Sequence, residues 1–153
     1  MMTPEEKITQ LGLSLPPAPK PAGLYQPCVI SRNLAFLSGQ ISRDMAGKIL
    51  EGRVGEDLSL AQGQEAAKLA ALNALSIMKN AIGFAKIARI VKMTGFVQTA
   101  PDFHEIPAVL NKASELFVAV MGEPGAHARS AVGVASLPLN AAVEIELVLE
   151  LKS

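Results

Sequence analysis

The longest regular hydrophobic pattern in the chain lies between Ser59 and Ile82, where apolar residues recur every three or four positions. The stripe consists of Ala67, Ala70, Ala71, Ala74, Met78 and Ile82, and polar residues at Glu65, Lys68, Ser76 and Lys79 mark the opposite side. This period predicts a helix that buries its alanines closely against a sheet and exposes its polar side to solvent. Asp57 or Ser59 can cap its start, and Gly83 is suited to end it.

A second helix is predicted over Pro107–Met121. Its apolar face holds Val109, Leu110, Ala113, Leu116, Phe117, Val120 and Met121. Pro107 must lie in the first turn or before it, because a proline deeper inside would break the helix. The segment Gly122–Gly125 ends it. A short helix is also predicted over Pro4–Gln10, with Thr3 as its N-cap.

Six segments have the pattern of β-strands, namely 25–31, 33–38, 48–51, 87–99, 129–135 and 142–151. The last alternates most cleanly, with Val143, Ile145, Leu147, Leu149 and Leu151 on one face and Glu144, Glu146, Val148 and Glu150 on the other. The first two strands are expected to form a hairpin with its turn at Arg32–Asn33.

The order of these elements predicts an α+β domain, in which two helices cover one face of a mixed sheet. In the strand 129–135 we expect Val132 and Val134 to face the helices and the set with Arg129 to face the uncovered side. Val148 lies on the uncovered side as well. An open face of this kind indicates partial burial against another subunit.

Composition narrows the functional classes. The chain has 153 residues, of which 50% are hydrophobic, so it is expected to fold as one domain. Lys and Arg number 14, as do Asp and Glu, and this zero net charge argues against a protein that binds nucleic acid through its phosphates. One Cys excludes an internal disulfide, and two His make a histidine metal cluster unexpected. No signal-like or membrane-length apolar segment occurs, so a cytoplasmic protein without membrane contact is expected.

Arg129 and Glu144 are the first candidates for chemistry. The planar guanidinium of Arg129, flanked by small residues, suits recognition of a carboxylate through two parallel hydrogen bonds. Glu144 lies on an otherwise apolar strand, where a carboxylate can take a proton or orient a water. Spacing alone leaves open that Arg129 is a surface residue, or is ion-paired with Glu144 or Glu146, and that Glu144 is merely solvated.

The remaining candidates are weaker. Tyr25, the only tyrosine, could present its hydroxyl at a cleft or simply begin a strand, and Ser38–Gly39 alone indicates a turn. Cys28 is expected to be an inert core thiol, and His104 and His127 to be solvated. No phosphate-binding glycine motif or metal-ligand spacing occurs, so neither cofactor nor metal is expected.

Four segments together carry a resemblance. They are YQPCVISRNLAFLSGQI, the alanine-rich helix, IVKMTGFVQTAPDF and ARSAVGVASLPLNAAVEIE, in that order. From about Ala22 to the C-terminus the chain resembles the YjgF-type family of reactive intermediate deaminases, which also carries the label endoribonuclease L-PSP. The SGQI loop and the ARS–LP–VEIE ending are the most specific parts. Residues 1–21 would then be an N-terminal extension and 22–153 a single YjgF-like domain.

The resemblance implies a chorismate-mutase-like α+β fold, a six-stranded mixed sheet with two helices on one face. It further implies homotrimers with clefts between subunits and no cofactor. In such a cleft Arg129 would clamp a substrate carboxylate and Glu144 would help to hold a water. Tyr25, Ser38 and Gly39 would line the pocket. The implied reaction hydrolyses an enamine or imine of an amino acid to a 2-oxo acid and ammonia.

The sequence departs from the family pattern at three places. Ala131 stands where the family often has Cys, and Pro107 stands where it often has an Asn early in the second helix. The extension 1–21 is the third. These features place the chain in a longer subgroup, and the loss of the Asn is expected to remove a polar pocket contact.

Three functions follow, in order of preference. The first is hydrolysis of 2-imino or 2-enamino acids. The second is non-catalytic binding of small carboxylates in the same clefts. The third is the endoribonuclease of the family label, which the zero net charge and the 4% aromatic content argue against.

Overall fold

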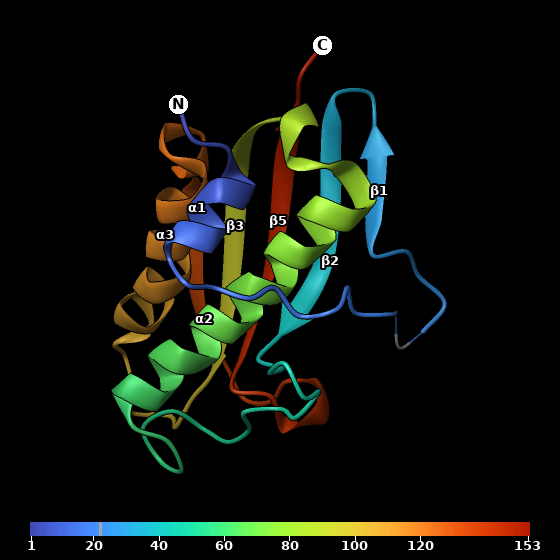
Figure 1. The fold of residues 1–153 in the computed structure, drawn as a ribbon. Helices are drawn as coiled ribbons and strands as arrows, with labels where there is room; N and C mark the ends of the chain where they lie inside the picture. Colours follow the sequence, from blue (N-terminus) through green and yellow to red (C-terminus); the bar gives the residue numbers. More distant parts are fainter. Residues whose placement is uncertain (22) are drawn as a thin grey trace.

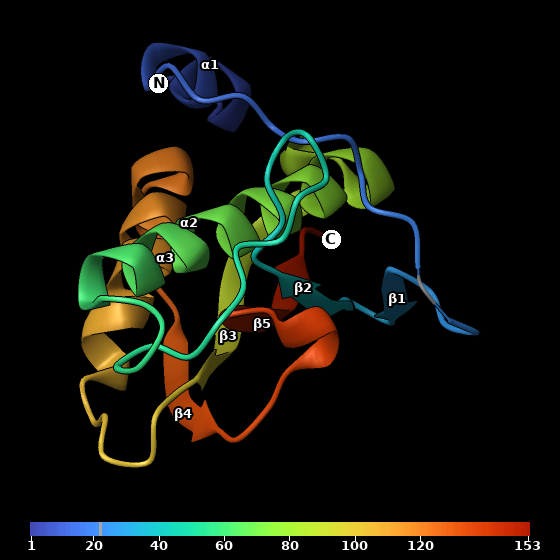
Figure 2. The same cartoon turned by 90° about the horizontal axis from the view of Figure 1, so that it is seen from below.

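One mixed sheet forms the centre of the computed structural model, which describes residues 1–21 and 23–153. Its strands are β1 (Cys28–Ser31), β2 (Leu34–Ile41), β3 (Ile87–Gln98), β4 (Ala128–Val134) and β5 (Val143–Leu151), in the spatial order β1-β2-β5-β3-β4. The pair β3–β4 is parallel, and the other neighbours are antiparallel. The helices lie on one side of this sheet, so its other face is open (Figures 1 and 2). The predicted α+β architecture is therefore present.

The helices begin and end close to their predicted bounds. They are α1 (Pro4–Gln10), α2 (Leu60–Ile77) and α3 (Ile106–Met121), and α2 continues as a π-helical turn over Met78–Ile82. Ser59 rather than Asp57 caps α2, since its side chain accepts from the backbone N–H of Gln62. Within residues 1–21 and 23–153, no helix is long and apolar enough to cross a bilayer.

The predicted third strand, 48–51, does not form. Ile49 and Glu51 make only isolated bridges, to Arg43 and Ala141 respectively. The segment is short and lies between Gly47 and Gly52, whose positive φ angles of 86° and 122° turn the chain away on both sides. Among the described residues the sheet has five strands, not the six expected.

The face assignment predicted for β4 is wrong. Its register places Ala131 beside Gly95 and Gly133 beside Val97, on the side that carries α3. A Cβ at Gly95 would overlap Leu110 of α3, and one at Gly133 would overlap Ile106. Small residues face the helix because α3 approaches the strands so closely. The valines of β4 therefore face the open side, and Val132 is 39% exposed.

The first part of the chain, with α1, lies on the helical side of the sheet (Figure 2). Ile8 of α1 is buried in the core cluster, and α1 contacts α3. The chain then crosses α2 towards β1 (Figure 1). At this crossing the Ser76 hydroxyl donates to the Pro16 carbonyl at 2.6 Å, and both residues are buried. Ser76 was predicted to face solvent, but the crossing segment covers that side of α2.

The Ser76 hydrogen bond gives a test of this attachment. Ser76→Ala should lower the free energy of unfolding by about 1–3 kcal/mol, because it leaves the buried Pro16 carbonyl without a donor. Hydrogen exchange and proteolysis within residues 11–21 should accelerate. Ser14→Ala, an exposed change in the same segment, is the control. Equal denaturation midpoints and exchange rates for the two variants would contradict the attachment.

Candidate functional site

A cavity of about 280 Å³ lies where β2 and β5 meet the segment that leads into β1. Its lining comes from four parts of the chain: Pro19, Lys20, Pro21, Tyr25 and Pro27 before β1; Gly39, Gln40, Ile41 and Arg43 in and after β2; Asn73 of α2; and Pro138, Leu139 and Glu144 around the start of β5. Tyr25, Gly39 and Glu144, three of the predicted site residues, are thus together in one chain.

Gly39 and Glu144 fit each other closely. The pairing of β2 with β5 shifts between Leu37 and Gln40, which bulges the strand at Ser38–Gly39. A Cβ on Gly39 would overlap the Glu144 carboxylate. The glycine is therefore needed for close approach of the backbone to this side chain.

The Glu144 carboxyl is half-buried on the open face of β5. Burial raises its pKa above the usual value for Glu, and the nearby charge of Glu146 raises the pKa further. A raised pKa brings a carboxyl nearer to neutral pH, where it can exchange protons with a bound water.

The other predicted pocket residues differ in their roles. Tyr25 lines the cavity and is 49% exposed. Ser38 does not line it, and its hydroxyl instead donates to the Gln26 carbonyl at 2.5 Å. This bond holds the segment before β1 against β2. Cys28 is partly buried against the core, and burial raises the pKa of its thiol.

Arg129 lies on the helix side of β4, and its guanidinium meets neutral oxygens. Its Nη1 donates to Asn111 Oδ1 at 2.9 Å and to Ser114 Oγ at 3.1 Å, both on α3. Among the described residues it forms no ion pair, so the pairing with Glu144 or Glu146 considered above does not occur. Its Nη2 and Nε make no hydrogen bond to the part of the chain described, which leaves the other edge of the guanidinium available.

His127 fixes the direction of this network. Its Nδ1 is 2.7 Å from the Gly125 carbonyl, which can only accept, so Nδ1 carries the proton. In the neutral ring Nε2 then accepts from the Ser114 hydroxyl at 3.0 Å, which leaves the Ser114 oxygen free to accept from Arg129. His127 is half-buried and packs edge-on against Phe117. The prediction that His127 is solvated is therefore wrong.

The sequence pattern did not identify Asn111 and Ser114 as candidate site residues. The resemblance described above predicts that Pro107 replaces the Asn found early in this helix. The structure starts α3 at Ile106, and Asn111 contacts Arg129 from one turn further along. The signal that could have found them is helical spacing, since Asn111 and Ser114 are three positions apart and share a face.

Arg129 and Glu144 are not brought together within one chain. Arg129 pairs with Met93, which pairs in turn with Leu147, whereas Glu144 pairs with Phe96. They therefore lie two strands and three residues apart, a backbone separation of roughly 14 Å. They also project from opposite faces of the sheet.

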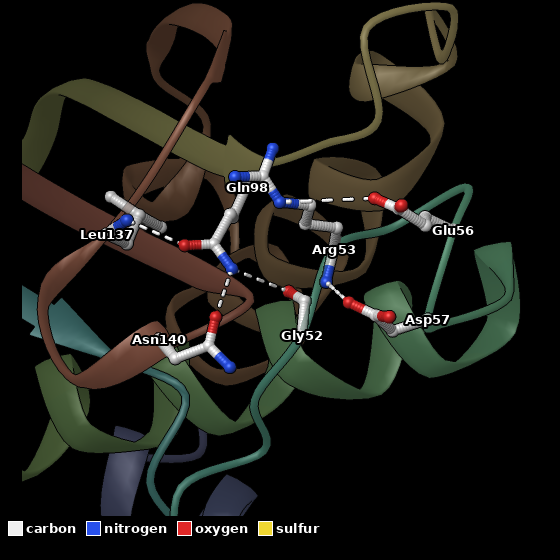
Figure 3. A network of polar contacts seen from close by, with 7 residues as sticks. All are labelled: Gly52, Arg53, Glu56, Asp57, Gln98, Leu137 and Asn140. Atoms are coloured by element: carbon white, nitrogen blue, oxygen red, sulfur yellow. Dashed lines mark hydrogen bonds and ion pairs between the residues drawn. The ribbon is translucent and has the colours of Figure 1, made fainter.

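Gln98, at the end of β3, is the centre of a polar network, which Figure 3 shows. Its side chain is 2% exposed and donates to the Gly52 carbonyl at 3.1 Å and to Asn140 Oδ1 at 2.7 Å. It also accepts from the Leu137 N–H at 2.7 Å. This network holds the turn 138–140, in which Leu139 adopts an unusual φ of 56° and lines the cavity.

In the described part of the chain, no three His, Cys, Asp or Glu side chains gather as a metal site would require. The described chain thus holds two separate candidate features: a half-buried carboxyl beside a small cavity, and a guanidinium held by neutral groups on the other face of the sheet.

Comparison with known proteins assigns the family. The family described as Endoribonuclease L-PSP matches residues 16–150, most of the chain. The chain belongs to this family.

Relatives within the L-PSP family carry different names. Protein TCP17 of Trypanosoma cruzi is 40% identical over 148 residues, covering 95% of this chain and 92% of that protein. A 2-iminobutanoate/2-iminopropanoate deaminase of Dermatophagoides farinae is 33% identical, covering 88% and 91%. The crystal structure of Atu1372 from Agrobacterium tumefaciens, a protein of unknown function, is 43% identical with a TM-score of 0.90, covering 98% and 94%.

The raised pKa of Glu144 predicts how stability of this L-PSP protein varies with pH. Glu144→Gln should raise the free energy of unfolding at neutral pH by less than about 1 kcal/mol, because a partly buried charge is removed. The wild-type folded state takes up this proton before the unfolded chain does. Wild-type stability therefore rises as pH falls through the window between the two pKa values, and the advantage of the variant shrinks. Urea denaturation of both proteins across that window measures the difference, and a pH-independent difference would contradict it.

Proposed function

We propose that this protein hydrolyses 2-imino or 2-enamino carboxylates to 2-oxo acids and ammonia, in clefts between the subunits of a homotrimer. The observation that carries the proposal is the state of Arg129. Its guanidinium is held by Asn111 and Ser114, lacks an ion-pair partner in the described chain, and keeps one edge available. A guanidinium in this state is suited to a carboxylate ligand.

Glu144 supplies the second part of the reaction. With its raised pKa, the carboxyl can take a proton from a bound water as the oxygen attacks the imine carbon. The Glu144 carboxyl then returns this proton to the nitrogen of the carbinolamine. The C–N bond breaks to release ammonia, and the hydroxyl gives up its proton to solvent as the C=O bond forms. A protonated imine carbon is already electrophilic, so positioning of the substrate and the water supplies much of the acceleration.

The arrangement of Arg129 and Glu144 supports a site shared between copies. Within one chain they lie on opposite faces of the sheet, so one small substrate cannot reach both. The open face carries apolar side chains that a second copy would cover, including Val29, Phe36 and Val132, which are 53%, 44% and 39% exposed. Contact between β4 of one copy and the cavity of another would bring the two residues together.

Two alternative functions would give other results in an assay of imine hydrolysis. A binding module would hold small carboxylates without releasing ammonia. An endoribonuclease, as the family is described, would need to engage a phosphate backbone, for which the zero net charge of this chain gives no general attraction. The deaminase relative, at 33% identity, supports hydrolysis of imines over both.

A coupled assay tests the proposal. An amino-acid oxidase generates the imine in situ, and the decay of the imine is followed with and without this protein. Wild type should accelerate hydrolysis, and Arg129→Ala should lower kcat/KM by about 100-fold through the loss of the carboxylate contact.

Arg89→Ala is the matched control, since Arg89 is paired on the surface with Glu123 at 3.9 Å. It should retain wild-type activity. Saturable binding of small carboxylates without acceleration would favour the binding module, and cleavage of RNA without imine hydrolysis would favour the nuclease.

The oligomer is tested by paired substitutions of similarly exposed valines. Val132→Glu places a charge on the open face, whereas Val118→Glu places one on the outer side of α3, where Val118 is 44% exposed. In sedimentation equilibrium we expect a trimer for wild type and for Val118→Glu, and dissociation for Val132→Glu. A wild-type protein that sediments as a monomer would contradict the proposal that two copies share the site.

A further inference from the structure

The N-terminal extension forms one wall of the candidate cavity. It is fixed at two points, by Ile8 buried against α3 and by the 2.6 Å hydrogen bond from Ser76 to Pro16. From there the chain runs directly to Pro19, Lys20 and Pro21, all of which line the cavity with Glu144. The extension therefore contributes to the site itself.

Lys20 is held in a restricted backbone conformation at this wall. Pro19 fixes its own φ, and Lys20 precedes Pro21, which confines it to extended conformations. The ammonium of Lys20 has no hydrogen bond or ion pair to any described residue. An exposed lysine beside a cavity, with limited backbone freedom and no partner among the described residues, is suited to bind an anionic ligand.

Arg43 adds a second cation to the same cavity. Its backbone carbonyl accepts from Asn73 Nδ2 at 2.8 Å, which ties it to the buried side of α2. Among the described residues its guanidinium makes one hydrogen bond, of 3.5 Å to the carbonyl of Gly47, which lies outside the lining of this cavity. Asn73 is 2% exposed and lines the cavity, and its Oδ1 accepts no hydrogen bond from the described residues.

The charges of the lining do not balance. Lys20 and Arg43 carry positive charge, and Glu144 is the single carboxyl of the described lining. Even with Glu144 ionised, this lining has a net positive charge, although the same two cations also border a neighbouring cavity that Asp44 lines. In one chain the cavity has a volume of about 280 Å³, which suits a small ligand.

We propose that Lys20 and Arg43 form a subsite for a second carboxylate, so that the preferred substrates are imines of acidic amino acids. This inference rests on the proposed function. In this arrangement, Arg129 of a neighbouring copy binds the substrate carboxylate next to the imine carbon. Lys20 and Arg43 bind the second carboxylate, at the end of the substrate's side chain. The N-terminal extension thereby determines which side chains are accepted.

Binding of stable products tests the subsite without requiring turnover. Isothermal titration of the full-length protein compares 2-oxoglutarate, a dicarboxylate, with 2-oxobutanoate, a monocarboxylate. Wild type should bind the dicarboxylate at least about tenfold more tightly, which corresponds to one lost or gained interaction of about 1.4 kcal/mol. Lys20→Met and Arg43→Met should each remove most of that preference.

Lys79→Met, an exposed change on the π-helical turn outside the cavity, should keep the preference. Equal affinities of wild type for the two acids, or an undiminished preference in both cavity variants, would overturn the inference. Failure of both acids to bind would overturn it as well.

Turnover separates the inference from the proposed function. The imines of glutamate and of 2-aminobutyrate are generated by oxidases, and the ratio of their kcat/KM values should fall about tenfold in Lys20→Met. A dicarboxylate preference in binding without any turnover would retain the subsite and reject the deaminase. Turnover with an unchanged ratio in both variants would retain the deaminase and reject the subsite.

Discussion

Close contact between α3 and the strands β3 and β4 determines most of what this molecule presents to its surroundings. Leu110 and Ile106 of α3 lie so close to the strands that no side chain fits at Gly95 or Gly133. The helix can therefore lie low enough for Asn111 and Ser114 to reach Arg129. The same packing turns Val132 to the open face. One steric constraint thus orients the guanidinium and leaves an apolar surface to be covered.

The site also depends on an electrostatic division across the sheet. The carboxyl of Glu144 lies on the open face, against the bulge at Gly39, whereas Arg129 lies on the helix side, beyond β3. Had these two side chains met in one chain, they would have neutralised each other as an ion pair. Their separation keeps a guanidinium without an ion-pair partner in the described chain and a carboxyl with a raised pKa. In the proposed oligomer, both would then be available to a ligand enclosed by two copies.

The sequence pattern predicted the helices and the long strands well, because burial follows a regular period in α2, α3 and β5. It failed where tertiary packing overrides that period. Segment 48–51 has strand-like residues, but glycines on both sides turn it away from the sheet. The larger residues of β4 were assigned to the core, whereas close helix packing requires the small ones there. Tyr25, Gly39 and Glu144 were foreseen and share a cavity. Asn111 was not foreseen, because its contact with Arg129 depends on where α3 begins.

The attachment of residues 11–21 to the helices has a consequence for how such a protein can diversify. Residues 11–21 form no part of the sheet, yet Pro19, Lys20 and Pro21 border the cavity. These three residues lie outside the strand pairing and the core cluster, so substitutions at them leave both untouched. The residues at this wall of the cavity can therefore be substituted with little loss of folding stability. Mutations of this kind are the ones through which a conserved scaffold most readily acquires new ligand preferences.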